Sequence, residues 1–431
     1  MMRVKYPFFI LFLFFWFGCD KDTNNQEWVD VTYVTPMYKS TSDLASEIFV
    51  DEPKVQTSLG KIITYGDMIF INQPMEGIHV VDNSNPASPM NHSFINIPGN
   101  VDLAIVDNHL YADMFSALVV FDLSNLESPK FLEDFTVEDV FYYDSYWNFP
   151  NEIWEEGHVR FAEYVDTSMG IVVGWETEVR RERIDNTYGP ELAFDDVGVA
   201  VPGSDVDFVS NRSTAGSMAR FLPIEGYLYT INFSDLVLFQ LAQNYKPNPW
   251  IRINTQTQAE TLFHLNDLLF VGSVNGMLMY DITDASDPLF INKIEHMRSC
   301  DPVVADLEYA YVTLRGGTNC FTDLNELQII DIQTPEDLQV VSHKSLFNPH
   351  GLGIYEDHLI ICDGSAGIKV LDVADRSQPE IMTSYPIGFA YDVIIDYPNA
   401  MVVGEEMLFQ YDLSDLPELT LLSQTPIHSS E

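Results

Sequence analysis

The chain is poor in basic residues and in cysteine. Its 431 residues include 21 Lys and Arg against 65 Asp and Glu, which gives a formal net charge of −44, and it has 4 cysteines. A body with this charge repels phosphate backbones and anionic lipid head groups, so we expect no nucleic-acid partner. The hydrophobic fraction of 46% is ample for a buried core.

Helical periodicity and recognised catalytic motifs are also missing. No segment keeps a sustained helical period between capping residues, which favours an all-β protein. The sequence has no nucleophile–base, zinc or phosphate-loop motif. We therefore expect a non-enzymatic protein without a catalytic residue or a cofactor.

One apolar run lies at the N-terminus. Arg3 and Lys5 precede residues 6–18, which are almost wholly apolar and aromatic. This run is shorter than the roughly 20 residues of a relaxed membrane span, and its charge-then-apolar order is that of a secretory signal. We therefore predict a signal peptide over residues 1–18 and a tether and N-terminal segment over residues 19–56.

The end of this signal resembles that of a bacterial lipoprotein, although Trp16 and Phe17 depart from the usual residues. The resemblance implies that Cys19 becomes the lipidated first residue. The acidic residues 20–22 resemble the surface-export signals of some Gram-negative lipoproteins. We thus expect an exported lipoprotein of the outer membrane or cell surface that meets the membrane through its lipid anchor alone.

A short phrase, an apolar strand that ends in Asp before a polar turn, occurs seven times. The anchor positions are 40 or 41 residues apart, with one spacing of 50 and one of 118. The long spacing indicates an insertion of about 80 residues, at 136–216, since units of about 40 residues must stack to bury a core. The copies are GIHVVD (77–82), ALVVFD (117–122), DLVLFQ (235–240), GMLMYD (276–281), ELQIID (326–331), GIKVLD (367–372) and EMLFQYD (406–412).

Each unit contains four short β runs divided by turn residues, which is the strand count of a propeller blade. In the second unit these runs cover 101–106, 109–114, 117–122 and 129–135. We predict an all-β, seven-bladed β-propeller over residues 57–431, with the insertion between the second and third blades. Whether an N-terminal strand within residues 30–56 closes the last blade stays open.

The phrases GIHVVDNSNPASP, ALVVFDLSNLESP and GIKVLDVADRSQP resemble the LVIVD repeat. The resemblance covers about residues 57–426 and implies a bacterial or archaeal cell-surface propeller with no defined reaction.

The repeated Asp is interpreted as a turn residue. Turn formers follow it, and its carboxylate can accept the backbone N–H two residues on. Gln240 replaces it once, and an amide is a poor substitute for a charged metal ligand. The predicted turn residues are Asp82, Asp122, Asp281, Asp331, Asp372 and Asp412.

Two further cysteines are placed to form a disulfide. Cys300 opens the first strand of the fifth unit and Cys320 follows the second, so antiparallel pairing brings both to one end of a blade. Closing a loop of about 20 residues would contribute roughly 3 kcal/mol in the chain-entropy model.

Four carboxylates align at the starts of first strands, which line the channel of a propeller. A ring of such oxygen ligands could hold Ca²⁺ at the channel mouth, although each could equally cap its own strand or face solvent. The set is Asp102, Glu260, Asp301 and Asp392, with His350 one position away in the sixth unit.

The insertion is rich in aromatic and acidic residues in its first half, and we expect residues 182–215 to be in part a mobile loop. Its rings could form a contact surface or pack onto the propeller. The resulting prediction is a monomeric, surface-tethered binding or scaffold propeller for an envelope protein or glycan. The alternatives are a component of an envelope assembly machine and a hydrolase, lyase or cation-dependent module that uses the acidic channel mouth.

Overall fold

The computed structural model describes residues 26–56, 60–126, 128–143, 145, 149, 158–185, 219–295, 302–316, 324–405 and 407–426. These residues fall into two compact units. One takes its residues from 1–37, 148–165 and 173–199, and the other from 38–147, 166–172 and 200–431. The larger unit holds the repeats.

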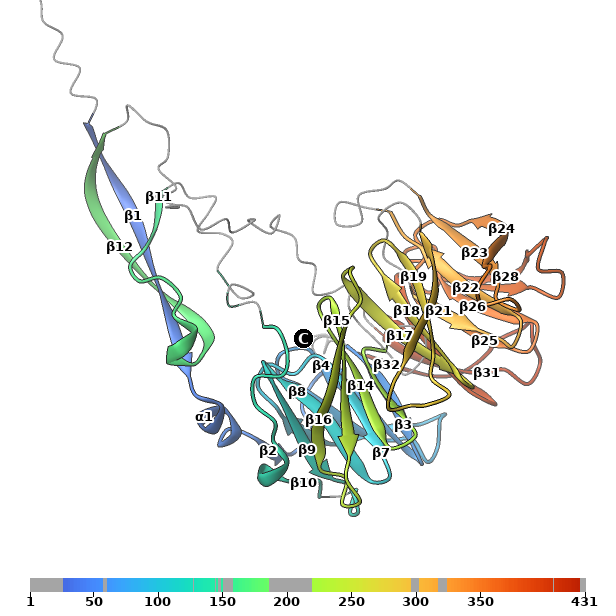
Figure 1. Ribbon diagram of the computed structural model, residues 1–431, viewed down its shortest axis with the longest axis horizontal. Coiled ribbons are helices and arrows are strands. Elements are labelled where there is room, and N and C mark those ends of the chain that lie inside the picture. Colours follow the sequence, from blue (N-terminus) through green and yellow to red (C-terminus); the bar gives the residue numbers. More distant parts are fainter. Residues whose placement is uncertain are drawn as a thin grey trace, which may run out of the picture. The chain divides into compact units, whose positions relative to one another are not determined.

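The described residues contain eight sheets (Figure 1). Seven of them contain four consecutive antiparallel strands in chain order, and one of these seven carries a fifth strand. The first sheet comprises β3 (Ile62–Tyr65), β4 (Met68–Gln73), β5 (Gly77–Asp82) and β6 (Met90–Asn96), and the second β7 (Leu103–Val106), β8 (His109–Met114), β9 (Ala117–Asp122) and β10 (Lys130–Phe131). The third comprises β13 (Phe221–Ile224), β14 (Tyr227–Asn232), β15 (Asp235–Leu241) and β16 (Pro247–Asn254), and the fourth β17 (Ala259–Leu265), β18 (Leu268–Ser273), β19 (Gly276–Asp281) and β20 (Leu289–Glu295).

The remaining repeat sheets follow the same order. The fifth comprises β21 (Val303–Ala305), β22 (Tyr309–Leu314), β23 (Glu326–Asp331) and β24 (Gln339–Ser345), and the sixth β25 (Leu352–Tyr355), β26 (His358–Cys362), β27 (Ile368–Asp372) and β28 (Glu380–Tyr385). The seventh comprises β29 (Ala390–Asp396), β30 (Asn399–Gly404), β31 (Met407–Asp412) and β32 (Thr420–Pro426). The prediction of repeated four-stranded units is confirmed.

Local turn chemistry explains the regular hairpins. The first and second strands of the second sheet are joined by Asp107 and Asn108, whose φ angles of 41° and 63° are those of a two-residue hairpin turn. The third strand begins with a glycine in the first and fourth sheets. A Cβ on Gly77 would lie 2.1 Å from the carbonyl oxygen of Ile95, and one on Gly276 would lie 2.0 Å from that of Ile294. Both positions therefore require glycine.

Apolar clusters join neighbouring sheets. From the second sheet to the seventh, every two consecutive sheets share one such cluster. The first sheet also packs against the seventh, through Ile62 and Ile71 on one side and Val403 on the other. Each sheet thus gains most of its burial from its neighbours, because a large apolar side chain contributes about 1.5–3 kcal/mol when it is buried.

A recurrent hydrogen bond reinforces these contacts. The backbone carbonyl four residues after the turn Asp accepts a side-chain bond from a neighbouring sheet in four of the turns. The fourth of these bonds runs from the seventh sheet to the turn of the first. The donors and acceptors are Tyr229 to Ala285, Asn292 to Pro335, Ser342 to Arg376, and Ser423 to Pro86.

The segment before the repeats is also structured. β2 (Phe49–Asp51) pairs with β6, so it adds a fifth strand to the first sheet and does not extend the seventh. Between β1 and β2 lies the single-turn helix α1 (Thr41–Ala45), which Ser40 caps through its side chain. The second sheet differs from expectation, because β10 has two residues and the 3₁₀ turn Glu133–Phe135 follows it.

The eighth sheet pairs the N-terminal segment with the insertion. β1 (Gln26–Lys39) lies between β11 (His158–Phe161) and β12 (Ile171–Asp185), and a 3₁₀ turn, Thr167–Met169, precedes β12. Phe149, Phe161 and Trp175 form an aromatic cluster in this unit, with ring centroids 5.0–5.9 Å apart. Here the insertion rings pack on one another, and residues 171–185 of the insertion form β12.

Candidate functional site

The six turn carboxylates adopt one geometry. Each accepts a hydrogen bond from the backbone N–H two residues on, at 2.8–2.9 Å. The pKa of Asp281 lies below its ordinary value, chiefly because the Thr283 side chain also donates to it. Gln240 makes a different bond, from its Nε2 to the Tyr227 hydroxyl. The donors to Asp82, Asp122, Asp281, Asp331, Asp372 and Asp412 are the N–H groups of Ser84, Ser124, Thr283, Gln333, Ala374 and Ser414.

The strand register places three of the four predicted channel carboxylates, and one of these three differs from the prediction. Leu103, Leu262 and Val393 each pair with the fourth residue of the second strand of their sheet. Asp102 and Asp392 therefore occupy one equivalent position. Glu260 does not, because it is the extra residue of a β-bulge. Its assignment to the same position was wrong, and it matches His350 instead.

Asp102 forms a buried ion pair. Its Oδ1 lies 2.7 Å from Nζ of Lys61, and both side chains are 1% exposed. Lys61 also donates to the Phe221 carbonyl at 3.1 Å, and the backbone N–H of Arg220 donates to Asp102. Burial lowers the pKa of Lys61 from its ordinary value, and the Asp102 carboxylate opposes this shift. The pair links the starts of the first three sheets.

Asp113 lies beside this pair. Its Oδ1 accepts hydrogen bonds from the backbone N–H groups of Val101 and Asp102 and from the Asn100 side chain, at 2.7–2.9 Å. Burial raises the pKa of Asp113 to about 6, although those backbone bonds oppose the shift. A carboxyl group that titrates near pH 6 therefore sits inside the sheet packing.

Two further aligned residues, His350 and Asp392, lie at the starts of the sixth and seventh sheets. Asp392 is fully buried, and its Oδ1 would lie 1.7 Å from a Cβ on Gly351, so a glycine there admits the carboxylate. His350 is 4% exposed, and Arg315 Nη1 lies 2.9 Å from its Nδ1. Burial, with the Arg315 charge, lowers the pKa of His350 to about 2, so it stays neutral and accepts from Arg315.

The predicted metal site gains no support from these positions. Within the part of the chain that the structure describes, no group of three or more His, Cys, Asp or Glu side chains could hold a metal ion. Asp301 lies outside the described residues, as do Cys19, Cys300 and Cys320. Cys362 is a buried free thiol, and burial raises its pKa well above the ordinary value.

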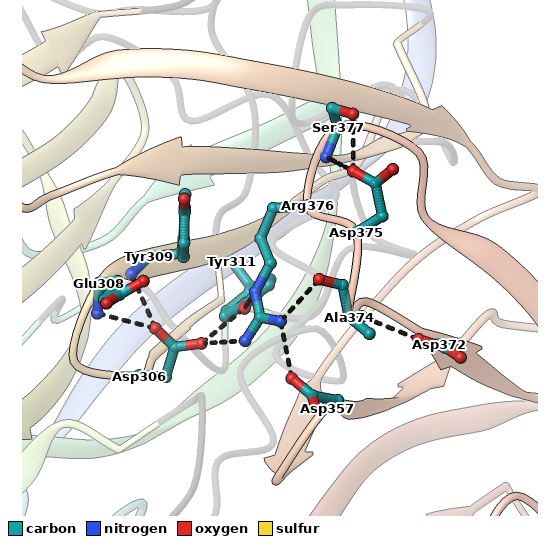
Figure 2. Close-up of polar contacts among 10 residues, drawn as sticks. All are labelled: Asp306, Glu308, Tyr309, Tyr311, Asp357, Asp372, Ala374, Asp375, Arg376 and Ser377. Atoms are coloured by element: carbon teal, nitrogen blue, oxygen red, sulfur yellow. Dashed lines mark hydrogen bonds and ion pairs between the residues drawn. The ribbon is translucent and has the colours of Figure 1, made fainter.

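A recess between the fifth and sixth sheets was not predicted. It has a volume of about 450 Å³ and is lined by Glu308, Tyr309, Val341 and the turn residues 374–377. Figure 2 shows the Arg376 guanidinium held between Asp306, Asp357 and Tyr311. Although burial raises the pKa of Asp306, hydrogen bonds from Tyr311, from two backbone N–H groups and from Arg376 bring it below its ordinary value.

The sequence does carry a signal for this recess. Arg376 stands four residues after its turn Asp, where the other Asp-anchored turns have Pro, Leu or Ala. Arg376 is therefore the one charged residue at a position that is apolar in the other Asp-anchored turns. No residue pattern along the chain shows that Asp306 and Asp357, on two different sheets, meet it.

None of the helices in the described residues is long and apolar enough to span a membrane. Residues 60–94 and 350–386 match the LVIVD repeat, and these segments cover most of the first and sixth sheets. Among curated proteins no match was found.

Two solved structures share the architecture at low identity. A protein from Lactobacillus plantarum aligns with a TM-score of 0.54 at 11% identity, over 86% of this chain and 96% of that one. The computationally designed Ika8 protein aligns with a TM-score of 0.50 at 8% identity, over 88% and 90% of the two chains. These likenesses bear on the fold alone. The chain is an all-β repeat protein that carries LVIVD repeats, and its four-stranded sheets fit a β-propeller.

Proposed function

We propose that this protein is a non-catalytic binding or scaffold propeller of the cell envelope, with an envelope protein or glycan as its partner. The seven repeat sheets form a closed ring of seven blades, and the protein is a monomer. Residues 1–18 are removed, and a lipid on Cys19 holds the protein at the outer membrane or cell surface. Packing of the first sheet on the seventh supports closure of the ring.

This proposal rests on a difference in accessibility: the charged residues at the starts of the first strands are buried, whereas the recess is open. At the starts of the first strands Lys61, Asp102 and Asp113 are buried: Lys61 pairs with Asp102, and the Asp102 backbone N–H donates to Asp113. The recess beside Arg376, in contrast, is an open volume of about 450 Å³, within the range of ligand sites. A ring in which the charges of Lys61 and Asp102 are paired and buried, and whose accessible hollow lies between blades, suits recognition better than a reaction in the channel.

A crosslinking experiment tests the binding role. A photoreactive phenylalanine replaces the exposed Glu308, which lines the recess without occupying the place beside Val341, in the full chain expressed in its native host. The matched control carries the same group at Met382, on the next sheet and 49% exposed. We expect a discrete adduct with an envelope component from position 308 and none from position 382. Equal labelling at both positions, or none, contradicts the proposal.

The anchor and the disulfide have separate tests. Cys19→Ala is expected to abolish palmitate labelling and to move the protein from the membrane to the soluble fraction. An unchanged fractionation of this variant refutes lipidation. Mass spectrometry of the unreduced protein is expected to find the peptides of Cys300 and Cys320 joined, and two separate free-thiol peptides refute the bond.

A further inference from the structure

The interface between the third and fourth sheets has a place equivalent to the recess, and the side chain of Trp250 occupies it. The outer strand of each repeat sheet except the second has a β-bulge with one extra residue. In the third sheet that residue is Trp250, since Leu238 pairs with Ile251 and Phe239 with Pro249. In the fifth sheet it is Val341, by the same register. Trp250 and Val341 are therefore structurally equivalent.

The surroundings of the two residues match as well. Tyr227 and Tyr309 each open the second strand of their sheet and pair with the last residue of the repeated phrase. The facing turns belong to the fourth and the sixth sheets. In each turn a Ser, Ser286 or Ser377, donates its N–H and its hydroxyl to the Asp two residues before it.

At the place that Trp250 occupies, the indole lies against the next sheet. Trp250 Nε1 donates to the carbonyl of Ser286 at 2.9 Å, and its ring centroid is 6.3 Å from that of Tyr227. The side chain is 53% exposed, so it rests on the rim of the interface and not in the core. An indole with one ring N–H thus suits this place in the repeat.

At the recess the smaller Val341 leaves that place open. One further change accompanies it: Arg376 stands where the fourth sheet has Ala285. The Arg376 guanidinium lies 5.5 Å from the centroid of the Tyr309 ring and is fixed by its two carboxylate partners. A planar cation of this kind attracts the face of an aromatic ring and repels a second cation.

We propose that the recess binds an aromatic side chain of a partner protein, a tryptophan, whose indole takes the place that Trp250 fills two interfaces earlier, between the third and fourth sheets. Its ring lies beside Tyr309 and Arg376, and its N–H donates to the carbonyl of Ser377, the counterpart of Ser286. Val341 forms the apolar wall. This inference deepens the proposed binding function and rests on it, since it names the chemistry of the partner.

The test uses N-acetyl-L-tryptophanamide as the probe, with saturation-transfer NMR on the purified chain. We expect saturable binding with a dissociation constant on the order of 1 mM, as suits one anchored ring. Val341→Trp fills the recess as Trp250 does and is expected to weaken binding at least tenfold. Met382→Trp adds an indole at the next bulge and leaves binding unchanged. Binding equal in all three proteins, or absent from the wild type, overturns the inference.

Two further measurements separate the alternatives. Tyr309→Ala removes the aromatic ring beside the proposed indole without filling the recess. It is also expected to weaken binding of the probe at least tenfold, and unchanged binding counts against the site. N-acetyl-L-lysinamide is expected not to bind, and tighter binding of this cation than of the indole refutes an aromatic ligand. If the probe fails to bind but the crosslink at position 308 forms, the tryptophan inference falls and the binding function stands.

Discussion

Removing the charge of Lys61 tests the buried ion pair most directly. At 2.7 Å the attraction between Lys61 and Asp102 is about 6 kcal/mol at an effective dielectric constant of about 20. Taking both ions out of water costs several kcal/mol each, so the intact pair contributes little net stability. Lys61→Met removes the attraction but leaves the carboxylate buried, and such losses amount to about 3–5 kcal/mol.

The expected loss lies at the lower end of this range. Arg220 acts electrostatically on both Lys61 and Asp113, so positive charge remains near the carboxylates. The Phe221 carbonyl also loses its donor, which adds about 1 kcal/mol. We therefore expect Lys61→Met to lower the free energy of unfolding by about 3–4 kcal/mol in urea titrations followed by tryptophan fluorescence.

Two controls make the result specific. Lys130→Met removes an exposed lysine and is expected to change the free energy of unfolding by less than about 0.5 kcal/mol. The double variant Lys61→Met, Asp102→Asn is expected to cost about 2 kcal/mol less than the sum of the two single changes. A loss below about 1 kcal/mol in Lys61→Met, or strict additivity in the double variant, would refute the reasoning.

Three other predictions follow from the same contacts. The pKa of Asp113 rises from 3.8 to about 6 on folding, so the folded state holds the proton more tightly, and this group lowers stability by about 3 kcal/mol as the pH rises from about 4 to 6. Asp113→Asn is expected to flatten that part of the melting-temperature profile, and an unchanged slope contradicts the assignment. Tyr229→Phe loses the 2.6 Å bond to Ala285 and is expected to cost about 1 kcal/mol in urea, whereas a neutral change argues against the inter-sheet bond. Calcium titrated into the purified protein is expected to give no heat beyond dilution, because Asp102 is already paired with Lys61, and a saturable heat with a thermal shift would restore the channel cation site.

Sequence reasoning succeeded where the signal is local. Residues 276–284 contain a continuous apolar strand, an Asp that accepts a backbone N–H and turn formers, and the structure has all three. It failed where one residue shifts the register. The register makes Glu260 the extra residue of a β-bulge, one position before the place that Asp102 and Asp392 occupy, and an alignment of apolar runs does not reveal such an insertion.

Long-range pairing was equally hidden. β1 and β12 lie side by side although more than 130 residues separate them in the chain, and no periodicity links them. The partnership of Lys61 with Asp102 depends on two different sheets meeting. A lysine before an apolar strand looks in the sequence like any solvated strand end, so its burial follows from tertiary packing alone.

Each repeat sheet is made from one uninterrupted stretch, and the first and seventh exchange no strand. Their union depends on side chains such as Ser423 and on apolar packing. A single duplication or deletion in the gene can therefore add or remove one complete repeat sheet without leaving part of a sheet unpaired.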